Sequence, residues 1–144
     1  MSETITIRIL GPADAAVLSN VAPGVFDGPV VAEHTARFLA SPDHEMAVAL
    51  VGDLVVGMAS GVVYYHPDKA SQFWINEVGV GDDWLRRGIA TRLMTAILAR
   101  ARARGCVYHW LGTETENAPA RALYRKLGGS EETEIVLFDW DDED

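Results

Sequence analysis

One alternating segment and several β-rich runs predict strands along the first half of the chain. Isoleucines alternate with polar residues over Thr4–Ile9, the period of a half-buried strand. Two β-rich runs, 46–51 and 54–65, are separated by Gly52-Asp53, a dipeptide typical of a two-residue hairpin. A further strand is predicted over 72–80.

Helical periodicity dominates the second half. Apolar residues recur every fourth position after Gly88, at Ile89, Leu93, Ile97 and Ala101, which gives one apolar stripe. The predicted helices span 14–21, 31–40, 88–104 and 118–127, and further strands span 106–113 and 134–140. This order predicts an α/β fold in which a mixed sheet carries helices on its faces, as a single domain over residues 1–144.

Composition narrows the class of protein. Hydrophobic residues make up 49% and charged residues 23%, an ordinary globular balance. We expect no secretory signal and no membrane span, because no basic region precedes an apolar run and no apolar run is long enough. Cys106, the one cysteine, fits a reducing, cytoplasmic environment and a buried position. The four histidines show no metal-ligand spacing, so we expect no metal.

Charge is segregated along the chain. Nine of the twelve basic residues lie within 86–126 beside two acids, so that segment carries +7 and the remainder −16. The net charge of −9 argues against a nucleic-acid partner. An acidic remainder attracts a cation, although acidic surfaces also serve solubility.

The turn from the 72–80 strand into the 88–104 helix is a candidate anion site. The first turn of a helix presents backbone N–H groups without intrahelical partners. Gly88 and Ala90 leave these groups open, and Arg86 and Arg87 precede them. The turn therefore suits a phosphate, and the alternative is an ordinary strand-to-helix turn with two solvated arginines.

A second motif lies at 117–128. Asn117 is placed to cap the helix, and Pro119 suits its first turn. Periodicity places Tyr124 on the apolar face, as a core aromatic with its hydroxyl at the edge.

The two motifs together resemble the GNAT superfamily of N-acetyltransferases. The family's pyrophosphate signature, Arg or Gln, two residues, Gly, one residue, Gly or Ala, falls on 85–90, and its later Asn-to-Gly pattern falls on 117–128. The resemblance covers the chain from about Thr4 to Trp140 and implies a GNAT-like, mostly antiparallel sheet. Leu85 departs from the signature, which removes a side-chain contact to the cofactor.

The resemblance implies acetyl-CoA as co-substrate. The strand segment 78–80 would hold the pantetheine arm, and the amides after Arg86 would hold the pyrophosphate. The cofactor-binding residues it implies are Val78, Gly79, Val80, Arg86, Arg87, Gly88, Ile89, Ala90, Thr91, Asn117, Ala120 and Tyr124.

Two ionisable residues are catalytic candidates. A primary amine is mostly protonated near neutral pH and attacks only when neutral, so the site needs a base. Glu77 resembles the family's base, acting through a water, and Tyr124 would protonate the departing thiolate. The amide of Val78 would donate to the developing oxyanion. An exposed strand carboxylate is the alternative for Glu77.

Within the superfamily the chain is most similar to aminoglycoside 3-N-acetyltransferases of the gentamicin and fortimicin type. The similar segments are 75–80, 86–91, 122–128 and 138–141. Because aminoglycosides are polycations, acids outside the cofactor segment are candidate substrate ligands, namely Asp139, Asp141, Asp27 and Glu33. The alternatives are a polyamine, an amino acid derivative, a protein N-terminus, or a non-catalytic acetyl-CoA-binding module. By analogy we expect a homodimer.

Overall fold

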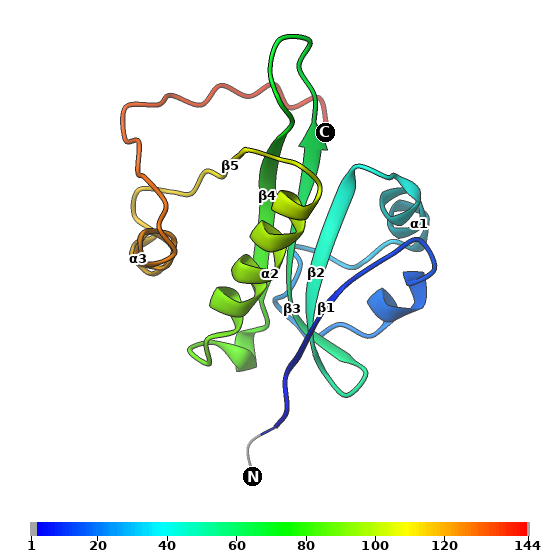
Figure 1. Ribbon diagram of the computed structural model, residues 1–144. Coiled ribbons are helices and arrows are strands. Elements are labelled where there is room, and N and C mark those ends of the chain that lie inside the picture. Colours follow the sequence, from blue (N-terminus) through cyan, green and yellow to red (C-terminus); the bar gives the residue numbers. More distant parts are fainter. Residues whose placement is uncertain (1–2, 144) are drawn as a thin grey trace. The chain divides into compact units, whose positions relative to one another are not determined.

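A five-stranded sheet forms the first of two compact units. The computed structural model describes residues 3–143 and divides into Met1–Gly112 and Thr113–Asp144. The strands follow the chain in the order β1 (Thr6–Ile9), β2 (His44–Val51), β3 (Leu54–Tyr64), β4 (Gln72–Val80) and β5 (Tyr108–Trp110) (Figure 1). Neighbouring strands are antiparallel except β4 and β5. The predicted α/β class is confirmed, with a mixed, mostly antiparallel sheet. One domain over 1–144 stays a prediction, and residues 1–2 and 144 lie outside the described residues.

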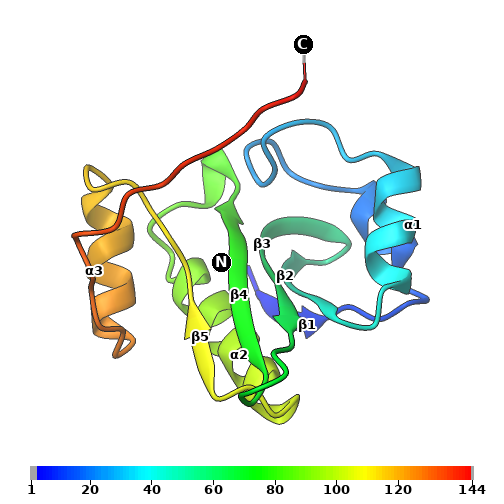
Figure 2. The ribbon, with the colours of Figure 1, turned by 90° about the horizontal axis from the view of Figure 1, so that it is seen from above.

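Helices lie on both faces of this sheet (Figure 2). The helical segments are η1 (Ala15–Ser19), α1 (Ala32–Ala40), η2 (Asp82–Trp84), α2 (Ile89–Ala103) and, in the second unit, α3 (Ala118–Lys126). The predicted stripe of α2 is buried at Ile89, Leu93, Ile97 and Ala101. Gly57 of β3 admits α2 closely, since a Cβ there would lie 3.0 Å from side-chain carbons of Ile89 and Leu93. Small residues on this face thus let the helix pack against the strands.

A β-bulge shifts the register in the middle of β4. Ser60 of β3 pairs with Glu77, whereas the next residue, Gly61, pairs with Ile75. Asn76 is therefore the extra residue, and two consecutive residues of β4 oppose one of β3. The bulge breaks the strict alternation of side chains between faces from this point onward.

An ion-pair network ties the end of α2 to the start of β2. Glu45 is 4% exposed, and its carboxylate accepts from Arg100 Nε at 3.0 Å and from Arg104. Arg104 also donates to Asp43 at 3.1 Å. A buried carboxylate with two guanidinium partners is well compensated. Removing its charge takes the carboxylate partner from Arg100 and leaves Arg104 paired with Asp43.

Glu45→Gln is therefore expected to lower the free energy of unfolding by about 1–2 kcal/mol, the range of a charged hydrogen bond to a partly exposed partner. Urea unfolding at pH 7 measures this change. Glu33→Gln, at an exposed position of α1, is the control and should change the free energy by less than about 0.5 kcal/mol. Equal stabilities of the two variants would contradict the role of the network.

The predicted strand at 134–140 is wrong. No strand is formed in this segment within the described residues, and Ile135, Val136, Leu137, Phe138 and Trp140 are 74–84% exposed. Its apolar residues are consecutive and do not alternate, and β-propensity forms a strand only where a neighbour supplies hydrogen bonds. Asp139 and Asp141, which as alternate residues would share one face of such a strand, therefore lie in irregular backbone.

The boundaries of the other predicted elements differ less from those of the structure. The predicted strand 106–113 shortens to Tyr108–Trp110, and the predicted helix after Asp14 is a short 3-10 segment. Asp14 does not cap that segment, because its carboxylate accepts from the Gly11 N–H and from Arg8 instead. Over residues 3–143, no helix combines the length and apolar character that crossing a bilayer requires.

Candidate active site

The turn into α2, the predicted anion site, leaves space open beside backbone N–H groups. Arg86 and Gly88 both adopt left-handed backbone conformations, with φ of 62° and 75°. Glycine adopts this conformation at little cost, whereas arginine is strained there. Space is open around Gly88, since a Cβ there would meet no atom within 4 Å. Among residues 3–143, no backbone carbonyl accepts from the N–H groups of Ile89, Ala90 or Thr91.

Arg87, one of the two arginines of the turn, contacts three neighbouring residues. The Arg87 guanidinium lies 4.6 Å from the centre of the Trp84 ring and 3.6 Å from a Glu3 oxygen. Arg87 also donates to the Asp83 carbonyl at 3.3 Å. Leu85, at the departure from the signature, is 56% exposed. The backbone cradle thus forms without a polar side chain at that position, and it fits a pyrophosphate.

The end of β4 offers an unpaired edge. β5 pairs with β4 only at Gln72–Trp74, while β4 continues to Val80. Within residues 3–143, backbone groups of Val78, Gly79 and Val80 on the β5 side therefore have no strand partner. An extended arm with amide groups, such as pantetheine, fits along such an edge by adding hydrogen bonds to it. Figure 1 shows that this edge leads directly into the turn before α2.

A cavity of about 380 Å³ opens on the face of the sheet that carries α1. Its lining comes from the loop before α1, from α1 and from three strands; it includes Phe26, Asp27, Val30, His34, Phe38, His44, Met46, Ser60, Asn76 and Glu77. Glu77 lies among these residues because Met46, Ser60 and Glu77 are direct cross-strand neighbours. The bulge also turns Asn76 to this cavity, where its Oδ1 accepts from the Ser60 hydroxyl at 3.3 Å. Glu77, the predicted base, thus lies in a cavity large enough for a small molecule.

Two carboxyl groups face this cavity. Glu77 is exposed on β4, as the alternative of an exposed strand carboxylate expects. Neighbouring groups still cover part of its carboxyl, which raises its pKa above the ordinary glutamate value, and the negative charge of Asp27 raises that pKa further. Both effects make Glu77 a better proton acceptor than a fully solvated carboxylate. A cationic amine between Asp27 and Glu77 would relieve their mutual repulsion. The candidate substrate ligand Asp27 and the candidate base are therefore brought together.

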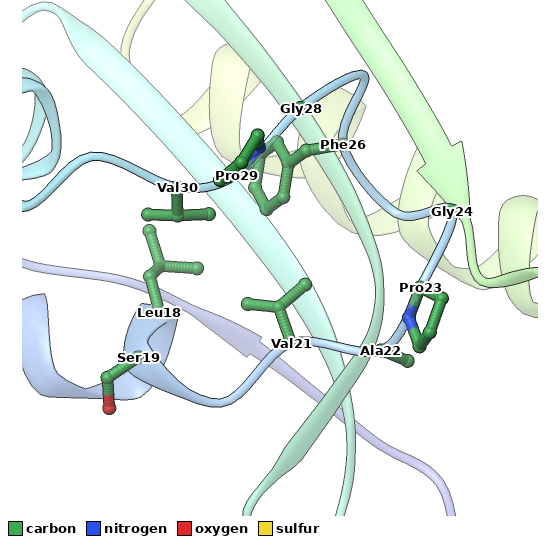
Figure 3. A pocket seen from close by; sticks show the side chains of 10 residues that line it. All are labelled: Leu18, Ser19, Val21, Ala22, Pro23, Gly24, Phe26, Gly28, Pro29 and Val30. Carbon is green, nitrogen blue, oxygen red and sulfur yellow. The ribbon is translucent and has the colours of Figure 1, made fainter.

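The loop that forms the cavity wall contacts β4 at a glycine. The same loop also lines a second hollow, of about 410 Å³. Phe26, Pro29 and Val30 are among the side chains that line it (Figure 3). A Cβ on Gly79 would overlap the Val25 carbonyl oxygen, so only glycine lets the loop lie this close to the strand.

Gly79→Ala is expected to displace the loop and to lower the free energy of unfolding by about 1–3 kcal/mol, as overpacking does. Urea unfolding measures this change. Gly112→Ala is the matched control, because a Cβ at Gly112 meets nothing within 4 Å. A variant with unchanged stability would show that the contact between Val25 and Gly79 is not required.

The second unit carries the other predicted residues. Asn117 caps α3 as predicted, since its Oδ1 accepts from the Ala120 N–H at 3.2 Å. Tyr124 is half-buried, and this burial raises the pKa of its hydroxyl, so the group stays protonated and able to donate. Its role and those of Asn117 and Ala120 stay predictions.

The remaining candidates lie outside the cavity lining. Glu33 is exposed on α1, while its neighbours His34 and Thr35 line the cavity. Asp139 and Asp141 are exposed in the irregular segment after α3. The roles of these acids stay predictions. Cys106 is 5% exposed, and burial raises the pKa of its thiol, as expected for a buried hydrophobic position.

Sequence reasoning missed several lining residues. The sequence predicts that Met46 and Ser60 lie in strands, but it does not predict on which face of the sheet their side chains lie. Strand register depends on pairing that no local pattern specifies. His34, Phe38 and His44 come from α1 and β2, which are separate in sequence. The runs 46–51 and 54–65 are almost wholly apolar or small, so they predict strands without indicating which side chains share a face. In the described part of the chain, no group of three or more His, Cys, Asp or Glu could hold a metal ion.

Curated proteins are similar to parts of this chain. L-2,4-diaminobutyric acid acetyltransferase of Marinococcus halophilus is 29% identical over 97 residues, covering 67% of this chain and 55% of the relative. The [ribosomal protein bS18]-alanine N-acetyltransferase of Salmonella typhimurium is 36% identical over 66 residues, covering 46% and 43%. The chain thus spans about half the length of the curated relatives it matches.

Solved structures share the fold. An aminoglycoside acetyltransferase from an uncultured soil metagenomic sample, in complex with sisomicin, aligns with a TM-score of 0.79 at 19% identity over 96% of this chain and 97% of that one. The aminoglycoside N-acetyltransferase AAC(6')-Iy in complex with CoA aligns with a TM-score of 0.73 at 18% identity over 99% and 97%. The model of the acetyltransferase (GNAT) family matches residues 19–129. That match covers most of the chain and contains both the turn into α2 and the Asn117 motif, and the chain therefore belongs to the GNAT family.

Proposed function

We propose that this protein transfers an acetyl group from acetyl-CoA directly to a primary amine of a small cationic acceptor. The observation that carries the proposal is the position of Glu77. It lines a cavity of acceptor size on one side, and it directly precedes the unpaired end of β4 on the other. A base at this junction is within reach of an amine in the cavity and of a thioester along the strand.

Residues of this chain carry out the proton transfers and stabilise the developing charge. When bound, acetyl-CoA supplies the activated thioester. Glu77 accepts the proton of the bound ammonium group, through a water, and the resulting neutral amine attacks. The N–H of Val78 donates to the oxygen that gains negative charge. Tyr124 gives its proton to the departing thiolate, a role that rests on the family resemblance.

For the acceptor we propose an aminoglycoside, acetylated at its 3-amino group. Asp27 and Glu77 provide negative charge at the cavity, and the acidic residues outside 86–126 favour a polycation. A diamino acid is the second candidate, because two curated relatives of this chain are named L-2,4-diaminobutyric acid acetyltransferases. A homodimer belongs to the same proposal, and sedimentation velocity tests it.

An acceptor panel tests the proposal. The protein is incubated with acetyl-CoA and, separately, with sisomicin, 2,4-diaminobutyrate, spermidine and a peptide with an N-terminal alanine, and free thiol is followed. We expect release with sisomicin and a product that NMR identifies as acetylated at position 3. Release with diaminobutyrate alone would transfer the assignment to the second candidate. No release with any amine, while CoA still binds, would indicate a non-catalytic acetyl-CoA-binding module.

A further inference from the structure

An aromatic pair stands partly exposed on the last two strands of the sheet. The rings of Trp74 and Trp110 are stacked, with centroids 5.6 Å apart and planes inclined by 18°. The two residues remain 39% and 42% exposed. Large aromatic side chains dominate binding energetics where they are partly uncovered and held in place. The pair belongs to neither cavity lining described above.

A hydrogen-bond chain fixes the pair. Trp110 Nε1 donates to the Tyr64 hydroxyl at 2.6 Å, and that hydroxyl donates to Gln72 Oε1 at 2.8 Å. The polar edge of Trp110 is thereby satisfied within the protein, and its ring cannot rotate without breaking this bond. A rigid aromatic surface loses little conformational entropy when a ligand covers it.

The bulge places this pair beside the proposed base. Ser60 pairs with Glu77 and Val62 pairs with Trp74, so the two residues of β4 lie opposite positions two apart on β3. Alternate residues of a strand share a face, at about 7 Å separation. Trp74 and Glu77 are three apart in sequence and would face opposite sides of a regular strand. The extra residue Asn76 returns them to one face.

We propose that Trp74 and Trp110 form a second acceptor subsite, which stacks on a neighbouring ring of a multi-ring amino sugar whose reacting amine lies beside Glu77. This inference rests on the proposed function and specifies its substrate class. The apolar face of a sugar ring packs on an indole, and its ammonium groups are attracted to the negative face of the aromatic system.

The electrostatics of the surface favour this occupant over an uncharged one. Asp27 and Glu77 attract an ammonium group at the cavity, while the indoles accept a ring beyond it. A linear polyamine or a small diamino acid would use the carboxylates but would lack a ring for the indole surface. The subsite would therefore bind a multi-ring acceptor more tightly than the smaller amines.

Kinetics with acceptors of two sizes test the subsite. Trp74→Ala and Trp110→Ala are compared with wild type, using sisomicin and the single ring 2-deoxystreptamine. We expect the KM of sisomicin to rise about tenfold with kcat within about twofold, the size of effect that one aromatic contact supports. The KM values of 2-deoxystreptamine and acetyl-CoA should stay within about twofold. Trp74→Phe should recover most of the loss, and Tyr65→Ala is the control at another exposed aromatic.

NMR provides a readout that does not require turnover or a variant. The indole N–H resonances of ¹⁵N-labelled wild-type protein are followed as sisomicin is added without acetyl-CoA. Resonances of Trp74 and Trp110 should shift in a saturable manner, while that of Trp84, on the turn before α2, should not.

Several outcomes overturn the subsite. Equal KM changes for both acceptors, an unchanged KM for sisomicin, or unmoved Trp74 and Trp110 resonances would each do so. Concentration-dependent shifts without sisomicin would assign the surface to a second copy of the chain. If no amine is acetylated although these resonances respond to sisomicin, the proposed function fails and the subsite stands as a binding site.

Discussion

Glu77→Gln is expected to lower kcat for amine acetylation by about 100- to 1,000-fold at pH 7, because the neutral amide cannot accept the proton of the bound ammonium group. The Kd of CoA should be unchanged, since the turn before α2 is separate from this side chain. Steady-state kinetics and calorimetric titration with CoA measure the two quantities. Glu132→Gln, which changes an exposed carboxylate that lies outside the cavity lining and has no predicted role, is the control and should keep full activity.

The pH dependence gives this prediction a second readout. Burial and Asp27 raise the pKa of Glu77, so wild-type kcat/KM should fall as pH decreases through a value above that of an ordinary glutamate. This acidic limb should be absent in Glu77→Gln, while the titration of the acceptor amine is common to both proteins. An unchanged kcat, or the same acidic limb in both proteins, would remove Glu77 from the mechanism.

The raised pKa of Glu77 also determines whether its ionisation raises or lowers the free energy of unfolding. A carboxyl whose pKa is higher in the folded state binds its proton more tightly there than in the unfolded chain. Its stabilising contribution is present below the unfolded pKa and is lost as pH rises through the folded pKa. At pH 7 the charged Glu77 therefore contributes no stability through this linkage. Glu77→Gln should accordingly unfold at the same urea concentration as wild type or a higher one.

Ala90→Glu is expected to raise the KM of acetyl-CoA by about tenfold or more. The new carboxylate would lie in the first turn of α2, where we propose that backbone N–H groups hold the pyrophosphate, and would repel it. The same charge interacts favourably with the helix dipole, so the free energy of unfolding should change by less than about 1 kcal/mol. A loss of cofactor affinity without a loss of stability would separate binding from folding.

Ala99→Glu is the matched control for this prediction. It introduces the same side chain at an exposed position near the other end of α2, away from the turn. Its KM for acetyl-CoA should stay within about twofold of wild type. Equal KM values for Ala90→Glu and Ala99→Glu would show that the turn does not bind the pyrophosphate.

Local signals predicted the elements on which the candidate site is built. The Gly52-Asp53 hairpin, β4, α2 and the Asn117 cap all lie where the sequence places them. Each depends on interactions within a few residues, such as turn conformation, capping or helical periodicity. Gly88 illustrates this well, because a glycine before an amphipathic run marked the helix start, and its left-handed φ of 75° is what the turn requires.

The segment 134–140 shows where such signals fail. Its residues favour β-structure, but a strand also requires hydrogen bonds from a neighbour that composition does not specify. Asp139 and Asp141, candidate substrate ligands within or beside this segment, lie in irregular backbone. Asp27, another candidate, lies at the cavity with Glu77. Residues of a loop can be placed only by what the loop packs against.

The sequence by itself determined β2, β3, β4, α2 and α3 and the place of the amide-rich turn before α2, because short-range backbone preferences and periodicity decide them. Tertiary structure decided which side chains meet. Strand pairing inserts Asn76 as a bulge, so that Trp74 and Glu77 share one face of the sheet, and Gly79 admits the loop that brings Asp27 to the cavity. Register and loop packing depend on contacts between residues distant in sequence, and no local pattern encodes these contacts.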